Sequence, residues 1–314
     1  MKQKNKHNLK EEVNFMGENT SQMNINWYPG HMAKTKRQII EDLKLVDIVV
    51  EIVDARIPMS SMNPDIEGYI KNKDRLIVLN KYDLADEAQN KLWVNRFKSK
   101  GLESVLVNSN NGDGINAAIK KIEEIYEKAQ AKYQNKGRIG KAIRVMVIGI
   151  PNVGKSSFIN RISKRNSATV GNRPGVTRQK QWIRINNNIE LLDTPGVLWP
   201  KFQNEEIALN LAYTGTIKDD VLATIEVGFS LLKYLINNDR NKLEIRYKLN
   251  NDEINEILNS DLEENEKALE ILHLIGKKRG AIISGGNIDE EKTAKIILDD
   301  FRSGKIGRIT IEKL

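Results

Sequence analysis

The stretch 149–157, with the sequence GIPNVGKSS, limits more than any other feature what this chain can fold into. It fits the phosphate-loop pattern G-x-x-x-x-G-K-[ST], whose glycines let the backbone turn tightly and bring N–H groups against a polyphosphate. The apolar run 143–148 before it predicts a buried strand, and Phe158, Ile159 and Ile162 recur after it at helical spacing. A strand, a loop and a helix in this order predict a nucleoside triphosphate site.

Each residue type in this loop suits one part of such a ligand. Backbone N–H groups and the positive end of the helix dipole face the phosphates, and Lys155 adds a point charge that also serves catalysis. The hydroxyl of Ser156 is a ligand for Mg²⁺. The nucleotide-binding residues expected here are Asn152, Val153, Gly154, Lys155, Ser156 and Ser157.

Strand and helix patterns alternate on both sides of this loop. Strands are expected at 47–53, 75–79, 104–107, 143–148, 180–185 and 189–192, and helices at 64–71, 87–98 and 115–132. This alternation predicts an α/β domain with a mostly parallel sheet and helices on both faces. Beyond about residue 201 amphipathic helical stripes dominate. We therefore expect a disordered leader at 1–23, an α/β domain at 24–203 and a smaller all-α domain at 204–314.

The motif Asn80-Lys81-Tyr82-Asp83 comes directly after the expected strand 75–79 and fits N-K-x-D. The aspartate accepts from guanine N1–H and its exocyclic amine, the Asn amide serves O6 or N7, and the Lys stem covers the ring face. A mismatched base costs roughly four orders of magnitude in selectivity. The four letters alone also fit an ordinary polar turn, but together with a phosphate loop they predict guanine recognition.

Three further sites follow the expected strands. Asp193-Thr194-Pro195-Gly196 fits D-x-x-G, so that Asp193 holds Mg²⁺ through water and the Gly196 N–H contacts the γ-phosphate. Thr177 lies in the preceding loop, where its hydroxyl joins the Mg²⁺ shell when the γ-phosphate is present. Asn108 and Ser109 end another strand and offer backbone N–H groups to the guanine carbonyl, which is the least specific of these assignments.

Composition limits the chemistry, the cellular compartment and the partners that this chain can have. Cysteine is absent, which excludes disulfides, cysteine-based zinc sites and thiol catalysis, and this suits a reducing cytoplasm. No apolar run reaches the length of a membrane span, so no membrane partner is expected. The net charge of +8 is uneven, with 33 Lys and Arg against 21 Asp and Glu over residues 1–200, and 17 against 21 after them. This asymmetry favours a polyanionic partner for the first two thirds of the chain.

The order of the motifs resembles a known family. Ras-like GTPases place the phosphate loop first, whereas here Asn80–Asp83 and Ser109 precede Gly149. This order is similar to that of circularly permuted P-loop GTPases, in which a Ras-like domain is kept because its ends lie close together. The runs YPGHMAK at 28–34, GIPNVGKS at 149–156 and GNID at 286–289, with 300–308 (DFRSGKIGR), resemble the ribosome biogenesis GTPase A family over roughly 25–314.

The resemblance implies a GTPase that lacks the usual catalytic glutamine. Val197 follows D-x-x-G where Ras-like enzymes carry the glutamine that orients water. The family's candidate is the histidine of P-G-H, here His31, whose neutral imidazole can orient or deprotonate water. His7 and His273 are the only other histidines. The alternative, that His31 only packs a turn, stays open.

The resemblance also implies cofactors and partners. Asn152 matches potassium-stimulated GTPases, in which it helps to hold K⁺, although an Asn there also simply tolerates the backbone of the turn. Slow intrinsic turnover implies an activating partner, which the family identifies as the precursor of the large (50S) ribosomal subunit with its rRNA and ribosomal proteins. We expect the protein to be a monomer away from the ribosome.

Two other functions share this GTPase domain. One is a GTP-gated RNA- or protein-binding module with incidental hydrolysis, and replacing His31 by Ala separates it from an enzyme-switch. The other is a tRNA- or membrane-linked GTPase, and the lack of an apolar anchor or lipidation motif disfavours the membrane form. Basic clusters are candidate rRNA phosphate contacts. They are Lys34/Lys36/Arg37, Lys136/Arg138/Lys141/Arg144, Lys277/Lys278/Arg279 and Arg302/Lys305/Arg308.

Overall fold

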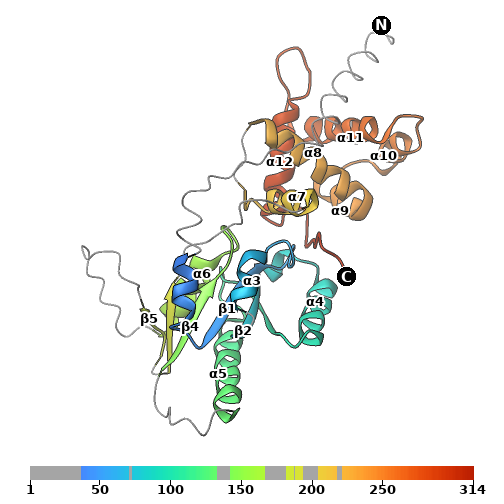
Figure 1. The fold of residues 1–314 in the computed structure, drawn as a ribbon. Coiled ribbons are helices and arrows are strands. Elements are labelled where there is room, and N and C mark those ends of the chain that lie inside the picture. Colours follow the sequence, from blue (N-terminus) through green and yellow to red (C-terminus); the bar gives the residue numbers. More distant parts are fainter. Residues whose placement is uncertain are drawn as a thin grey trace. The chain divides into compact units, whose positions relative to one another are not determined.

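The computed structural model describes residues 37–70, 73–132, 142–166, 182–186, 188–193, 204–217 and 221–314. These form two compact units. One is an α/β unit that combines 37–193 with the last five residues, and the other is a helical unit spanning 204–309. Each unit is described by itself below (Figure 1).

The α/β unit is built on a six-stranded sheet in the order β3-β2-β1-β4-β6-β5. All neighbours are parallel except the edge pair β5 and β6, which is antiparallel. The strands are β1 Ile48–Asp54, β2 Asp74–Asn80, β3 Glu103–Val107, β4 Ile143–Ile148, β5 Trp182–Arg184 and β6 Ile189–Asp193. The predicted strands are therefore confirmed, and the last two pair with each other as antiparallel neighbours.

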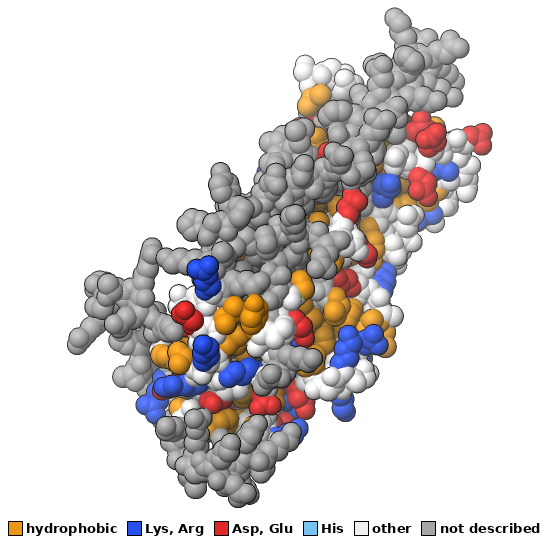
Figure 2. Space-filling view, in the orientation of Figure 1, with side chains coloured by type: hydrophobic (Ala, Val, Ile, Leu, Met, Phe, Trp, Pro, Cys, Tyr) orange, Lys and Arg blue, Asp and Glu red, His pale blue; other side chains and the backbone are white. Residues whose placement is uncertain are grey.

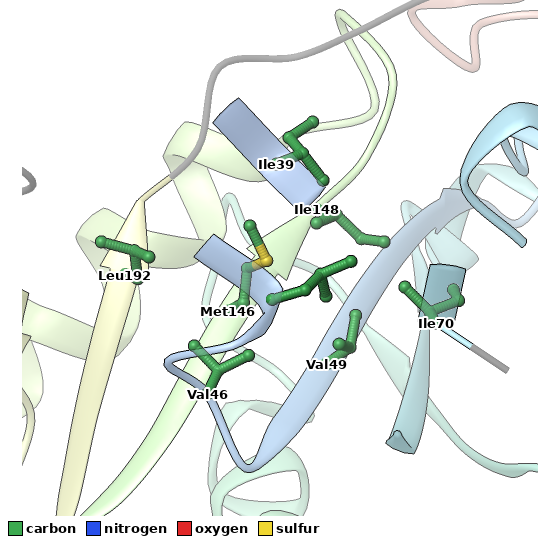
Figure 3. Packing of buried hydrophobic residues seen from close by; sticks show 8 residues of the cluster. Ile39, Val46, Val49, Ile70, Met146, Ile148 and Leu192 are labelled. Atoms are coloured by element: carbon green, nitrogen blue, oxygen red, sulfur yellow. The ribbon is translucent and has the colours of Figure 1, made fainter. Parts of the chain in front are cut away.

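Helices cover both faces of this sheet. They are the helix 37–43, α3 Pro64–Ile70, α4 Glu87–Ser99, α5 Ile115–Lys132 and α6 Lys155–Asn166. One face carries the helix 37–43 and α3, because Ile39 and Ile70 pack there against Val49, Met146 and Leu192 of neighbouring strands (Figure 3). Successive side chains of a strand point to opposite faces, so the other face of the sheet also needs cover. There α5 contacts β2 and β3, and α6 contacts β4.

The strand order reverses between β1 and β4. From β1 the chain adds β2 and β3 on one side, and from β4 it adds β6 and β5 on the other. In open α/β sheets, ligands bind beyond the carboxyl ends of the strands at such a switch point. The fold therefore provides a binding edge at the centre of the sheet.

The helical unit contains α7 Glu205–Tyr213, α8 Val221–Asn238, α9 Arg240–Tyr247, α10 Asn251–Leu258, α11 Glu264–Arg279 and α12 Glu290–Arg302. Amphipathic stripes were predicted beyond about residue 201, and the apolar stripes of α11 and α12 are buried. Asp289 caps α12, since its carboxylate accepts from the Lys292 N–H at 2.9 Å. Gly228 lets α8 approach α12, because a Cβ there would lie 2.7 Å from the Cβ of Ala294.

A buried carboxylate ties the helical unit together. Asp300 on α12 is 4% exposed and accepts from Nε and one terminal nitrogen of Arg246, both at 2.9 Å. Arg279 lies 3.3 Å away, with its guanidinium over the ring of Tyr247, and the Lys305 ammonium lies at 3.8 Å. These groups join α9, α11 and α12 through one acceptor.

One predicted boundary is wrong at its end. The sequence assigned all of 204–314 to the helical domain, but residues 310–314 belong to the α/β unit. The segment holds no periodic pattern, and its hydrogen bonds to residues 56–60 and to α4 join it to the α/β unit. None of the described helices is long and apolar enough to cross a membrane.

Candidate nucleotide-binding site

The predicted motifs converge on one edge of the sheet. Parallel strands end on the same side, and here β1 ends at Asp54, β2 at Asn80 and β3 just before Asn108. The phosphate loop follows β4, and Val147 of β4 is the register partner of Asp193 at the end of β6. Motifs that lie far apart in the sequence are therefore neighbours at the switch point.

Backbone conformation explains the residue types of the phosphate loop. Gly154 has φ +94°, and a Cβ there would lie only 2.2 Å from the side-chain nitrogen of Asn80. Gly149 lies against β1, since a Cβ there would come within 2.9 Å of the Ile52 carbonyl. Asn152 has φ +62°. Asn adopts the left-handed region more readily than most residues, so the turn itself gives a reason for Asn152.

Asn80 joins three of the predicted motifs. Its Nδ2 donates to the Val153 carbonyl at 2.6 Å, and its Oδ1 accepts from the backbone N–H and the hydroxyl of Ser109, at 3.0 and 2.8 Å. These bonds use both lone pairs of Oδ1 and one of two amide hydrogens. Asn80 therefore meets a base with one N–H at most, and its larger role is to fasten β2, β3 and the phosphate loop together.

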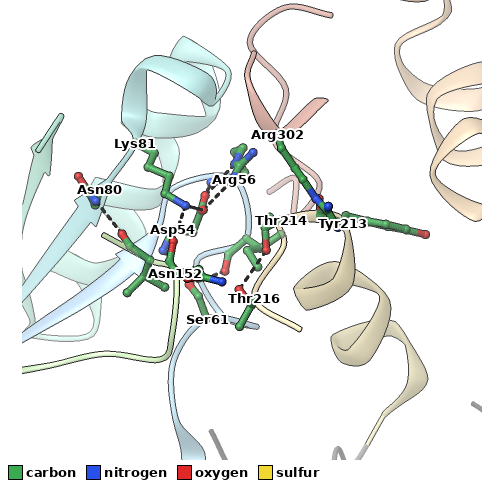
Figure 4. A network of polar contacts seen from close by, with 12 residues as sticks. Asp54, Arg56, Ser61, Asn80, Lys81, Asn152, Tyr213, Thr214, Thr216 and Arg302 are labelled. Atoms are coloured by element: carbon green, nitrogen blue, oxygen red, sulfur yellow. Dashed lines mark hydrogen bonds and ion pairs between the residues drawn. The ribbon is translucent and has the colours of Figure 1, made fainter. Parts of the chain in front are cut away.

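Lys81 connects the same strand end to the phosphate loop. Its Nζ donates to the Asn152 carbonyl at 2.7 Å and to Asp54 Oδ2 at 3.0 Å (Figure 4). The backbone of Lys81 is left-handed, with φ +59°. A non-glycine residue in this region marks a position where the surrounding contacts outweigh the backbone cost.

Asp54 and Arg56 complete this network, and the sequence analysis did not identify either. Arg56 donates from Nε and its terminal nitrogen to Asp54, at 2.9 and 2.7 Å, and the Asp54 N–H donates to Ser61 Oγ at 2.9 Å. Burial alone would raise the pKa of Asp54, but the positive charges of Arg56 and Lys81 outweigh it and lower the pKa below its usual value. The signal was available: a charged D-A-R run begins at Asp54, the last of seven buried strand residues.

The loop after β3 is fixed mainly by its own side chains. Asn108 Oδ1 accepts from the backbone N–H groups of Asn110 and Asn111, at 2.9 and 3.2 Å. Arg161 on α6 donates to the carbonyls of Ser109 and Asn110. The predicted pair Asn108 and Ser109 is therefore held between β2 and the helix that follows the phosphate loop.

The rest of the N-K-x-D motif forms a 3₁₀ turn, Tyr82–Leu84. The Tyr82 carbonyl accepts from the buried Asn90 side chain of α4 at 2.9 Å, which fixes the turn against that helix. Asp83 is exposed in this turn. Its carboxylate is therefore accessible to a ligand, as reading of a base requires.

Two of the three residues predicted to hold Mg²⁺, Ser156 and Asp193, are among the described residues. Ser156 lies in the first turn of α6 beside the buried Lys155, and the strand register brings the Asp193 backbone next to β4. A hydroxyl next to a phosphate-binding Lys, with an aspartate at the end of the neighbouring strand, is a combination of residue types that suits Mg²⁺. The other predicted residues, His31, Thr177 and Gly196, lie outside the described residues.

Comparisons with known proteins agree on one type of protein. A family model described as a 50S ribosome-binding GTPase matches residues 144–278, beginning in β4. A Ribosome biogenesis GTPase A from Bacillus licheniformis is 45% identical over 292 residues, covering 93% of this chain and 99% of that protein. The mouse Mitochondrial ribosome-associated GTPase 1 is 33% identical, covering 91% of this chain and 90% of its own length.

Solved structures give the same result. The GNP-bound YlqF of Thermotoga maritima matches with a TM-score of 0.58 at 25% identity, covering 89% of this chain and 98% of that one. A GDP-bound YlqF structure matches with a TM-score of 0.60. The likeness extends over both units, so it includes the helical region after the α/β unit.

Proposed function

This chain belongs to the circularly permuted ribosome biogenesis GTPase A family, a family of GTPases that act in ribosome biogenesis, and we propose that it serves late maturation of the large (50S) subunit. In this proposal it binds precursor rRNA and ribosomal proteins in the GTP state and leaves on hydrolysis. The observation that supports the proposal most is the pair of hydrogen bonds from Asn80 and Lys81 to the phosphate loop, which join two distant sequence segments at one edge of the sheet.

Hydrolysis in this proposal uses groups outside the usual Ras-like set. Val197 has no group that orients water, so His31 orients or deprotonates the attacking water when the ribosomal particle orders it. Lys155 and Thr177 stabilise charge at the phosphates. Supplied catalytic groups are worth about 10³–10⁵ in rate, so turnover without a particle is slow.

The metal assignments belong to the same proposal. Ser156, Thr177 and Asp193 hold Mg²⁺, which neutralises charge that develops on the phosphates. The Asn152 side chain contributes to K⁺ binding. Its left-handed backbone is an independent reason for an Asn there, so K⁺ dependence of turnover, measured against Na⁺, decides between the two roles.

The described basic residues differ in their availability for RNA. Lys277 and Lys278 are exposed at the end of α11. Arg302 instead donates to the carbonyls of Ala212 and Tyr213 at the end of α7, so it serves the fold. Figure 2 shows Lys and Arg interspersed with Asp and Glu among the described side chains of the face drawn. We therefore propose that phosphate contacts are distributed rather than confined to one patch.

Co-sedimentation tests the large-subunit role. The full chain is mixed with precursor and mature 50S particles in the presence of a non-hydrolysable GTP analogue, GDP or no nucleotide. The proposal predicts retention on precursor particles with the analogue and loss with GDP. Equal retention in both nucleotide states would overturn the proposed release on hydrolysis.

Replacing His31 by Ala tests the catalytic assignment, with His273→Ala as the matched control. His273 lies on α11 and contacts Glu290 at 2.7 Å, within the helical unit. Particle-stimulated hydrolysis collapses in the His31 variant alone, while GTP affinity stays. If stimulated hydrolysis survives in both variants, the catalytic group lies elsewhere. If the His31→Ala variant does not hydrolyse GTP but still dissociates from the particle as fast as the wild type, the GTP-gated binding module is favoured.

Cytoplasmic location and a monomeric state away from the ribosome complete the proposal. Light scattering of the purified protein with and without nucleotide tests the second point. A stable dimer in the GTP state contradicts it.

A further inference from the structure

The last five residues of the chain form a tail, 310–314, that docks on the α/β unit. The Ile311 N–H donates to the Arg56 carbonyl at 2.9 Å, and the Asp86 N–H donates to the Thr310 hydroxyl at 3.0 Å. The buried indole of Trp93 donates to the Glu312 carbonyl at 2.8 Å. The tail is therefore held by several specific bonds and not by apolar contact alone.

The Glu312 side chain makes a concentrated set of these bonds. Its Oε2 accepts from the Met59 N–H at 2.6 Å, and its Oε1 accepts from the Ser60 N–H at 2.8 Å and from the Ser60 hydroxyl. A carboxylate that accepts several N–H and O–H donors is held more strongly than a neutral acceptor. Glu312 thus fixes the turn 57–61, although it lies 252 positions from Ser60 in the sequence.

This turn carries the groups that hold Asp54. Ser61 accepts the Asp54 N–H, and Arg56, whose carbonyl receives the tail, binds both carboxylate oxygens of Asp54. Asp54 in turn binds the Lys81 ammonium, which also donates to the phosphate loop. A continuous series of hydrogen bonds, buried at its centre around Asp54, therefore leads from the tail to the nucleotide-binding motif.

We propose that Glu312 is a positioning residue for nucleotide binding, acting through Arg56 and Asp54 on Lys81. The inference rests on the GTP binding of the family and is independent of the proposed role on the 50S subunit. Residue 309 belongs to the helical unit and residue 310 to the α/β unit. The tail therefore connects the helical unit covalently to the contacts that place Lys81, without using the segment after D-x-x-G.

The test measures the affinity of the full chain for a fluorescent GDP in Glu312→Gln, with Glu87→Gln as control. Glu87 lies on α4 of the same unit, is two-thirds exposed, and pairs with Lys91 one helical turn along. We expect affinity to fall roughly threefold to tenfold in the Glu312 variant, as for networks that couple two sites, and to stay unchanged in the control. Unchanged affinity in both variants overturns the proposal.

A double-mutant cycle with Lys81→Met separates positioning from general stabilisation. If Glu312 acts through Lys81, the loss caused by Glu312→Gln disappears in the Lys81→Met background. The same loss in both backgrounds shows that the tail only stabilises the unit, and overturns the proposal. Should Glu312→Gln fail to fold, Ser60→Ala removes one of the three bonds and must show the same dependence on Lys81.

Discussion

Each unit of this molecule contains one buried aspartate that binds an arginine through two bonds. In the α/β unit Asp54 binds Arg56 and then Lys81, and in the helical unit Asp300 binds Arg246 and then Arg279. Both carboxylates are almost fully buried, at 1% and 4% exposure. The chemistry of the two clusters is the same, yet their surroundings differ.

The two clusters differ in the second positive side chain that binds the aspartate, which is Lys81 at Asp54 and Arg279 at Asp300. Arg279 ends α11 and Lys305 lies in the turn after α12, and both contact Asp300 of α12. Arg279 also lies over the ring of Tyr247 on α9. Lys81 belongs to N-K-x-D and reaches the phosphate loop. A buried ion pair is weak evidence for stability by itself, because desolvation offsets its attraction. The comparison suggests that the pair at Asp54 serves nucleotide binding and the cluster at Asp300 serves the fold.

Asp54→Asn gives the largest expected effect. It leaves Arg56 and Lys81 without their carboxylate, which should cost about 3–5 kcal/mol of unfolding free energy. The two described tryptophans, Trp93 and Trp182, both lie in the α/β unit, so denaturation followed by their fluorescence reports on that unit. We also expect weaker GDP binding. A folded Asp54→Asn variant with full GDP affinity would contradict the assignment of the Asp54 pair to nucleotide binding.

The same pair predicts an acid dependence. The pKa of Asp54 is lowered in the folded state from a reference value of 3.8, so its charge stabilises the fold above that pH. This contribution is lost as the pH falls below about 4. The difference in unfolding free energy between wild type and Asp54→Asn should be constant at about pH 5–7 and shrink below that window. A difference that grows on acidification contradicts the assignment.

Asp300→Asn should have a smaller effect of a different kind. Arg246 and Arg279 are partly exposed and regain water when the carboxylate is lost, so we expect a cost of about 1–3 kcal/mol. The loss should appear in far-ultraviolet circular dichroism and leave tryptophan fluorescence and GDP affinity unchanged. Lowered GDP affinity would show that the two clusters are not separate in function.

Lys305→Gln should be nearly silent. Its ammonium is 59% exposed and 3.8 Å from Asp300, and pairs of this kind are worth less than about 1 kcal/mol. Thermal unfolding followed by circular dichroism measures it. A loss as large as that of Asp300→Asn would mean that Lys305, and not Arg246, holds the carboxylate.

The sequence predicted the sheet, its helices and the convergence of the motifs, because these depend on local patterns. Buried β-branched runs defined the strands, and N-K-x-D and the phosphate loop each followed a strand end. Once the sheet is parallel, those ends must share an edge. The order of the motifs predicted the permuted fold through its resemblance to circularly permuted GTPases.

The sequence did not predict Asp54, Arg56 or the docked tail. Asp54 follows a strand, but nothing local shows that Lys81 binds it. Glu312 and Ser60 lie 252 residues apart, and periodicity carries no information on such a pair. Asn80 was assigned to the base, whereas the structure uses most of its amide to join three motifs. Polar contacts between distant segments depend on the finished fold.

The central claim is that base-reading residues encoded early and phosphate-binding residues encoded later form a single GTP site. The most direct test is the affinity of Asp83→Asn for GDP and for xanthosine diphosphate. We predict that GDP affinity falls by roughly two to four orders of magnitude while xanthosine diphosphate binds more tightly, because the amide complements the altered base edge. Unchanged preference for GDP would contradict the account.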